Sequence, residues 1–321
     1  MSATDTDRLL PFRLIYHDRY DLNFGEHVFP AQKYRLMRER LLAEGFAAPG
    51  DFLAPAAATD DELMLVHDRG WIERLKNGTL SFFEIRQLEV PYSRQMVQGF
   101  FLAAGGTTLA GRRALDDGIG FNLGGGFHHA FAGHGEGFCA IHDVAVAVRV
   151  LQRDCGIRRA MIVDCDVHHG NGTAAIFNGD GDVFTVSMHQ LYNYPAVKPS
   201  SSIDVDLADG VGDEEYLSEL RQALDHAYAR FQPDILLYVA GADPYVGDQL
   251  GGLALTLDGL IERDRTVIGT ALERHVPVVV TLAGGYARDL RDTVTIHVNT
   301  AYAARSCLRE IGWKKAANPG L

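Results

Sequence analysis

The chain has 321 residues, 47% of them hydrophobic and 22% charged, a composition that suits a globular protein with a large buried core. Its formal net charge of −12, from 42 acidic and 30 basic residues, disfavours nucleic acids and anionic membranes as partners. The four cysteines include no C-x-x-C pair, and no apolar run reaches the roughly 18 residues of a membrane span. We therefore expect a cytoplasmic protein without a disulfide framework, a thiolate zinc cluster or a membrane-spanning segment.

Short apolar runs rich in β-branched residues recur along the chain, at residues 12–17, 119–123, 160–164, 183–188, 234–240 and 277–283. Longer segments with helical periodicity lie between most of them, at residues 31–44, 139–154, 213–230 and 257–274. This alternation predicts an α/β fold with a mostly parallel sheet covered by helices on both faces. No linker divides the chain, so we expect a single domain over residues 1–321 with a frayed tail at 314–321.

Polar loops follow five of the apolar runs. They read GGGFHHA after residue 123, DCDVHHG after residue 163, His189 after residue 188, GADPYVGD after residue 240 and GGYARD after residue 283. In open parallel sheets the ligand crevice lies outside the carboxyl ends of the strands. We therefore expect these loops to converge on one site.

The loop DCDVHHG predicts a metal site. In an extended chain the side chains of Asp164, Asp166 and His168 point to the same face. Asp243, just after its own apolar run, could supply a third ligand, and Asp-His-Asp with an open position matches a catalytic metal site. Zinc is the first candidate, although iron(II) or another first-row ion would accept these ligands. The alternative is a polar loop without a metal.

Two further features suit a hydrolytic site beside such a metal. The pair His128-His129 follows three glycines, and one imidazole could take a proton from an attacking water and deliver it to a leaving amine. The hydroxyl of Tyr286, after two glycines, could donate to a developing oxyanion. Taken alone, the two histidines are more typical of a surface turn, and the tyrosine of a packed side chain.

The motifs GGGFHHA, GFCAIHD, DCDVHHGNG, GADPYVGDQLGGL and LAGGY, in this order and spacing, resemble the histone deacetylase family over most of the chain. GGGFHH, HHGNG and DEEYL are most similar to its class IV branch and bacterial members. The resemblance implies the arginase/deacetylase-like fold, a three-layer sandwich with an eight-stranded sheet. It also implies a zinc-dependent hydrolase that removes acetyl or longer acyl groups from lysine side chains of proteins or peptides. An amidase of a small acylated metabolite such as a polyamine, or a non-catalytic acyl-lysine-binding module, is the alternative.

Site residues carry over from this resemblance motif by motif. It implies a zinc site formed by Asp166, His168 and Asp243. The implied catalytic residues are His128, His129, Tyr286, Asp164 and Asn171. Among them, His129 would be the principal general base and acid, Tyr286 would polarise the acyl carbonyl, and Asp164 would accept a hydrogen bond from His128.

The resemblance further implies substrate contacts and a second ion. Gly137 would accept the scissile amide N–H through its carbonyl, and Phe138 and Tyr194 would flank an acyl-lysine tunnel. A structural K⁺ would be bound, mainly through backbone oxygens, by Asp164, Asp166, His168, Ser187 and Met188.

Asn171 departs from the commonest family pattern, because many members have an aspartate there that orients the second histidine. The amide oxygen can still accept the imidazole N–H, but it supplies no negative charge to favour imidazolium. We therefore expect His129 to stay neutral more readily. Asn171→Asp should raise the pKa of His129. The pH range over which the rate follows this ionisation should move upward, and an unshifted pH–rate profile would contradict this expectation.

Leu250 bears on the substrate. Polyamine deacetylases of this family carry a glutamate seven residues beyond the last zinc ligand, where this chain has Leu250. A cationic polyamine would lack that charge partner. We therefore expect a neutral, apolar entrance and an acyl-lysine or other acyl-amide substrate.

Overall fold

The computed structural model describes residues 7–22 and 24–313, so the expected frayed tail at 314–321 lies outside the described residues. Eight strands form one sheet in the order β2-β1-β3-β8-β7-β4-β5-β6, and all neighbouring strands are parallel. The strands are β1 (Arg13–Ile15), β2 (Phe52–Leu53), β3 (Ile119–Asn122), β4 (Ala160–Asp164), β5 (Val183–Gln190), β6 (Ile203–Leu207), β7 (Ile235–Val239) and β8 (Val278–Thr281). The predicted α/β class and the eight-stranded sheet are confirmed.

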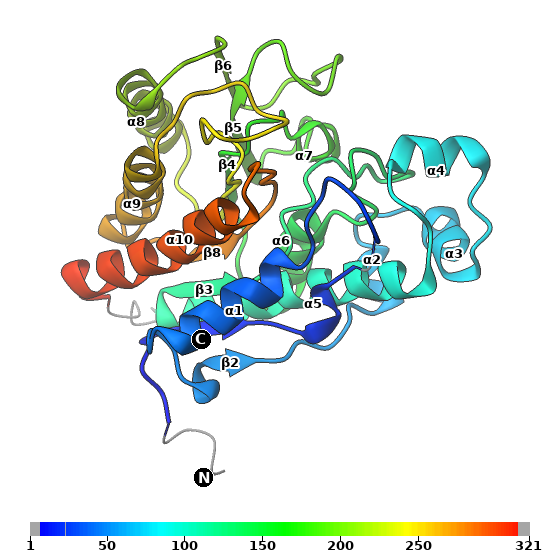
Figure 1. The fold of residues 1–321 in the computed structure, drawn as a ribbon, viewed down its shortest axis with the longest axis horizontal. Coiled ribbons are helices and arrows are strands. Elements are labelled where there is room, and N and C mark those ends of the chain that lie inside the picture. The colour runs from blue at the N-terminus through cyan, green and yellow to red at the C-terminus, as the bar shows by residue number, and fades with distance from the viewer. Residues whose placement is uncertain (1–6, 23, 314–321) are drawn as a thin grey trace.

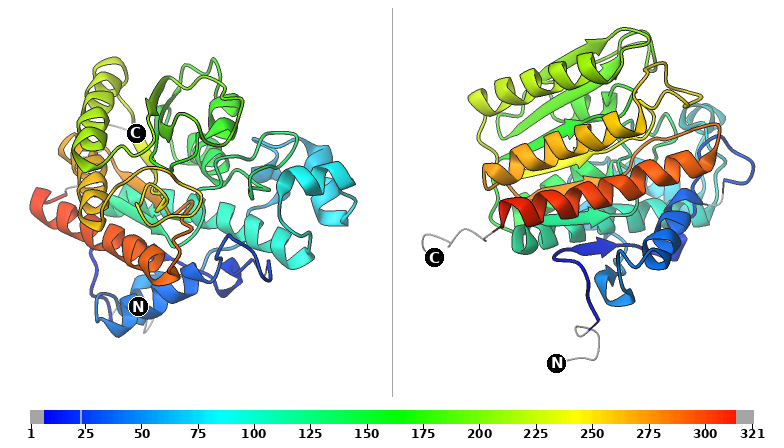
Figure 2. Two further views of the ribbon diagram at one scale, coloured as in Figure 1. Left: turned by 45° about the horizontal axis from the view of Figure 1, so that its top comes forward. Right: turned by 60° about the vertical axis from the view of Figure 1, so that its left-hand side comes forward.

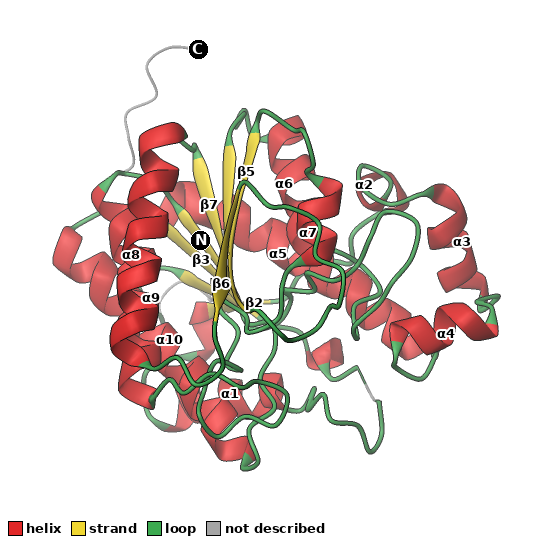
Figure 3. Ribbon diagram, turned by 90° about the horizontal axis from the view of Figure 1, so that it is seen from above, coloured by secondary structure: helices red, strands yellow, loops and turns green. Residues whose placement is uncertain are grey.

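Helices cover both faces of the sheet (Figures 1 and 3). Figure 2 shows three of them side by side on one face: α8 (Asp213–Arg230), α9 (Leu257–Glu273) and α10 (Leu290–Ile311). The other face carries α5 (Arg94–Asp117) and α6 (Asp143–Asp154), and α1 (Lys33–Ala43) contacts α10. The shorter helices are α2 (Asp60–Leu63), α3 (Arg69–Asn77), α4 (Phe82–Leu88) and α7 (Asn171–Ile176). None of the helices in the described ranges is both long and apolar enough to cross a lipid bilayer.

The central strands are buried on both faces. Every residue of β4 and β7 is buried, as expected for continuous apolar runs in a parallel sheet between helical layers. The edge strand β6 instead alternates, because the two aspartates of its sequence IDVDL are exposed. Polar side chains on an edge strand discourage pairing with another chain.

Several helices begin or end near the predicted residues. The segment 213–230 coincides with α8, and α1 and α9 lie within the predicted 31–44 and 257–274. Helix α6 begins at Asp143, four residues later than predicted, because His142 acts as its N-cap: the His142 ring accepts from the Ala145 N–H at 3.1 Å.

Candidate active site

Four of the five predicted polar loops converge at the carboxyl edge of the sheet. The loop after β4 carries Asp166 and His168, and the loop after its neighbour β7 carries Asp243. The loops after β3 and β8 carry the histidine pair and Tyr286. Four loops far apart in sequence therefore meet over adjacent central strands.

Asp166, His168 and Asp243 form a buried group whose ligand atoms lie within 4.8 Å of one another. Nδ1 of His168 lies 3.0 Å from Oδ1 of Asp166 and 3.3 Å from Oδ2 of Asp243. Oδ1 of Asp243 accepts the Val167 N–H at 2.8 Å, whereas its Oδ2 is buried without a hydrogen-bond partner. A buried carboxylate oxygen is costly unless a donor or cation compensates it. Two carboxylates and one imidazole therefore fit a divalent metal ion with an open position.

Gly284, from the motif LAGGY, lets the backbone approach this group. A Cβ at Gly284 would lie 2.0 Å from Oδ2 of Asp243 and 2.6 Å from Oδ2 of Asp166. Its N–H also donates to Oδ2 of Asp166 at 2.8 Å. Any side chain at position 284 would occupy the space beside the two carboxylates. The close packing therefore requires glycine at this position.

The charges of the metal-binding group are strongly coupled. Burial lowers the pKa of His168, but hydrogen bonds and charges from Asp166 and Asp243 outweigh burial and raise it to about 10. Burial and the Asp166 charge raise the pKa of Asp243 to about 7. A bound dication would reverse both shifts, because it favours ionised carboxylates and a neutral imidazole.

The histidine pair lies next to this group, with each Nδ1 hydrogen-bonded to a different acceptor. Nδ1 of His128 lies 2.6 Å from Oδ2 of Asp164, and Nδ1 of His129 lies 2.7 Å from Oδ1 of Asn171. The ring centroids are 4.0 Å apart. Both predicted pairings are present in the structure.

The two adjacent imidazoles have opposite pKa shifts. Burial lowers the pKa of His128, but Asp164 and Asp166 outweigh burial and raise it to about 9. The pKa of His129 is held well below 6.5 by burial, and next by the charges of His128 and His168. The carboxylates thus favour the charged form of His128, whereas burial favours the neutral form of His129.

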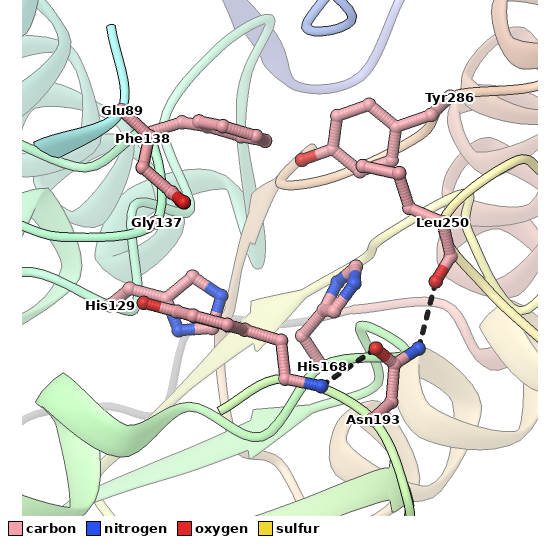
Figure 4. A pocket seen from close by; sticks show the side chains of 9 residues that line it. Glu89, His129, Gly137, Phe138, His168, Asn193, Leu250 and Tyr286 are labelled. Atoms are coloured by element: carbon pink, nitrogen blue, oxygen red, sulfur yellow. Dashed lines mark hydrogen bonds between the residues drawn. The ribbon is translucent and has the colours of Figure 1, made fainter. Parts of the chain in front are cut away.

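A pocket of about 180 Å³ opens above His129 and His168 (Figure 4). The rings of Phe138 and Tyr286 point toward one another across it, with centroids 6.1 Å apart. Its lining comprises Glu89, His129, Gly137, Phe138, His168, Asn193, Tyr194, Leu250 and Tyr286. All four residues expected to contact substrate are in this lining.

Phe138 reaches the pocket from a constrained backbone. Gly137 has φ +52° and Phe138 has φ +68°, a region that bulky residues rarely adopt. A Cβ at Gly137 would lie 2.7 Å from Cδ2 of His129. Such a conformation persists only where the surrounding structure enforces it, and it is often found at functional sites.

Tyr286 is held by Asp248, a residue that no motif singled out. Oδ2 of Asp248 accepts the Tyr286 N–H at 2.7 Å, and Oδ1 accepts the Leu250 N–H at 2.8 Å, so one carboxylate joins two loops of the pocket. Burial, and next the charges of Asp166 and Asp243, raise the pKa of Tyr286 well above 10. The phenol therefore remains a hydrogen-bond donor.

Two glutamates near the pocket were also missed. Glu89 lines the pocket, so the expectation of a neutral, wholly apolar entrance from Leu250 is wrong. Glu136 accepts hydrogen bonds from the side chains of Asn171 and Tyr194. Both glutamates lie in irregular segments, where no periodicity indicates which way a side chain points; the only signal was the position of Glu136 directly before Gly137.

A second group, formed by His169, His189 and Asp204, lies beside β5 and β6. Within this group, Nε2 of His169 lies 3.2 Å from Oδ1 of Asp204; His189 instead contacts a residue outside the group, with its Nδ1 3.0 Å from Oγ of Ser187. Contacts of this kind describe a hydrogen-bonded network at the sheet edge. His189 lies within β5 rather than in a loop after it and is not among the residues that line the pocket, so its expected place at the site is wrong.

Two of the residues expected to bind K⁺ lie on β5, next to β4. Ser187 is paired with Asp164 in the register of β4 and β5, and Met188 follows it. Both Ser187 and Met188 are buried.

A model of the histone deacetylase domain matches residues 27–301. The chain belongs to the histone deacetylase family. Membership makes it a deacetylase-type hydrolase of a metal-dependent family and accounts for the arginase/deacetylase-like sheet described above.

Several family members align with nearly the whole chain. An uncharacterised protein of Picosynechococcus sp. is 40% identical over 92% of this chain and 98% of its own length. Histone deacetylase 2 of Arabidopsis thaliana is 32% identical over 88% of this chain and 77% of its own. The acetoin utilization protein AcuC of Staphylococcus aureus is 30% identical over 80% of this chain and 69% of its own length. The crystal structure of the HDA15 HD domain superposes with a TM-score of 0.76 and 26% identity, covering 95% of this chain and 92% of that one.

Proposed function

We propose that this protein is a zinc-dependent lysine deacylase of the class IV type, which hydrolyses acetyl or longer acyl groups from lysine side chains of proteins or peptides. The observation that carries the proposal is the pocket over the Asp166-His168-Asp243 group, lined by a neutral imidazole and a protonated phenol. Hydrolysis of an amide needs a base, an oxyanion donor and an electrophile close together.

Asp166, His168 and Asp243 would hold the zinc ion, with iron(II) as the other candidate. When bound, the ion would polarise the acyl carbonyl and lower the pKa of water. Ser187, Met188 and the segment from Asp164 to His168 would hold a structural K⁺, mainly through backbone oxygens.

His129 takes the proton of the attacking water in this mechanism, because it is the neutral member of the pair. The same imidazole then gives the proton to the departing lysine amine. His128 is the member of the pair whose Nδ1 faces a carboxylate, Oδ2 of Asp164 at 2.6 Å, and that contact favours its charged form. The Tyr286 hydroxyl donates to that oxyanion, and the Gly137 carbonyl accepts the scissile amide N–H.

The pocket lining supports a linear acyl-lysine side chain. Phe138 and Leu250 offer apolar surface for its methylenes, and Tyr194 lies against His129 with ring centroids 4.9 Å apart. Glu89 favours a second candidate, a small cationic acyl amide such as an acetylated polyamine, because it is a potential charge partner at the same pocket. Both substrate classes would be hydrolysed by the same mechanism. They differ in the part of the substrate outside the pocket, which is a peptide in one class and a short polyamine in the other.

A panel of substrates separates them. We expect the zinc-loaded protein to release free lysine from acyl-lysine peptides, measured by mass spectrometry across chain lengths from acetyl to myristoyl, and to lose this activity with a chelator. Acetylated polyamines belong in the same panel. A preference for polyamines that is lost in Glu89→Gln would favour the second candidate, and no turnover of any substrate by protein with one zinc per chain would overturn the proposed hydrolysis.

A further inference from the structure

The amide of Asn171 bridges the pocket histidine and a carboxylate. Its Oδ1 lies 2.7 Å from Nδ1 of His129, and its Nδ2 donates to Oε1 of Glu136 at 2.5 Å. Asn171 is buried, and the Glu136 side chain is 14% exposed. The negative charge that the sequence analysis found missing behind His129 is therefore present one residue further away, on Glu136.

This bridge has only one consistent arrangement of donors and acceptors. An ionised carboxylate only accepts hydrogen bonds, so the NH₂ group of Asn171 must face Glu136. The amide oxygen then faces His129, whose Nδ1 must carry the proton. With the proton on Nδ1, the neutral ring keeps its lone pair on Nε2.

Glu136 is well supported as the fixed end of the bridge. Its Oε2 accepts from Nε2 of Gln87 at 3.0 Å and lies 3.3 Å from Nε2 of His134. Its Oε1 also accepts from the Tyr194 hydroxyl at 3.1 Å. Burial raises the pKa of Glu136, but these hydrogen bonds outweigh burial and lower it. At neutral pH the acceptor is thus ionised and held from several sides.

We propose that Glu136 is a positioning residue that orients the amide of Asn171 and thereby fixes His129 as the Nδ1–H tautomer, with Nε2 free to act as base. The contribution to turnover rests on the proposed function, whereas the tautomer is a property of the protein alone. A merely structural Glu136 would support the loop before Gly137 without influencing which nitrogen of His129 carries the proton.

Exchanging the amide and the carboxylate tests the bridge. In Asn171→Asp, the new carboxylate faces Glu136, where the amide NH₂ now donates to the Glu136 carboxylate. Two neighbouring carboxylates repel one another, so ionising both is unfavourable. We expect kcat to fall about tenfold or more, since the base loses its orientation. Adding Glu136→Gln supplies an NH₂ group to the carboxylate introduced at position 171 and should recover most of that loss. Glu136→Gln alone should cost about threefold or less, because its amide oxygen can still accept from Asn171.

The controls separate positioning from general support of the loop. Glu136→Ala should lower kcat about tenfold with little change in KM, whereas Gln87→Ala, which removes a donor to Oε2 only, should stay within about twofold. If the Asn171→Asp and Glu136→Gln effects simply multiply in the double variant, the proposal is overturned.

Nitrogen-15 NMR of histidine-labelled protein gives a readout independent of activity. We expect the His129 ring to show a protonated Nδ1 and an unprotonated Nε2 in the wild type, and a mixture of tautomers in Glu136→Ala. A wild-type His129 protonated on Nε2 would contradict the proposal even if the enzyme is active. The expected spectra from protein that turns over no substrate would uphold the bridge while the proposed function fails.

Discussion

Asp243→Asn should leave a folded protein that binds zinc poorly and hydrolyses acyl-lysine peptides at least about 10³-fold more slowly than the wild type. The amide keeps the oxygen that accepts the Val167 N–H, so the fold should be preserved. It replaces Oδ2, the buried atom without a hydrogen-bond partner, by an NH₂ group, which has no lone pair to offer a cation. A bound ion stabilises the transition state by several kcal/mol, which corresponds to about three powers of ten in rate.

The measurement is zinc content by mass spectrometry together with kcat and circular dichroism. Asp204→Ala is the matched control, because Asp204 belongs to the other group of two histidines and an aspartate and lies away from the pocket. We expect one zinc per chain in the wild type and in Asp204→Ala. An Asp243→Asn variant with full zinc content and near-normal turnover would remove Asp243 from the proposed metal site.

The sequence predicted the centre of the fold better than its edges. Strands β4 and β7 are continuous apolar runs because helices cover both of their faces, so burial is visible in composition. Strand β2 has two residues, and β6 carries exposed aspartates, so neither shows a strong pattern. Helix α5 was missed because glycines such as Gly105 and Gly106 lower its intrinsic helix propensity, which tertiary packing overrides.

The same contrast applies to the pocket. Asp166, His168 and Asp243 could be predicted because each directly follows or nearly follows a buried strand, and parallel strands end at one edge. Glu89 lines the pocket and Glu136 contacts Asn171 and Tyr194, both from irregular segments, where direction depends on local backbone geometry. Glu89 itself has φ 60°, a conformation that its sequence context does not indicate.

Opposite pKa shifts in two adjacent histidines assign different tasks to them. Burial lowers the pKa of both rings. For His128 the charges of Asp164 and Asp166 outweigh burial, whereas His129 has only a neutral amide at Nδ1 and is lowered further by the charges of His128 and His168. Pairs of titratable groups with diverging pKa values are typical of acid–base sites. The arrangement therefore supports His129 as the base that is ready at neutral pH.

His129→Gln should lower kcat by about 10²–10⁴-fold while leaving zinc content unchanged, the loss expected when a general base is removed. His128→Gln should have a smaller effect, since the protonated ring supplies charge and does not accept the proton. The pH dependence has a definite sign: the pKa of His129 is lowered, so the base is neutral above its ordinary pKa of 6.5. The acidic limb of the wild-type profile should thus lie below pH 6.5.

A bound dication does not alter that sign, because an added positive charge lowers the pKa of a neighbouring imidazole further. The pH–rate profile of kcat, recorded from pH 5 to 9 with zinc content checked at each pH, tests the assignment. An acidic limb well above pH 6.5, or a larger loss in His128→Gln than in His129→Gln, would transfer the role of base to His128. If His129 is the base, the residual activity of His129→Gln should be independent of pH across the range in which the wild-type acidic limb falls, because the group that titrates there has been removed.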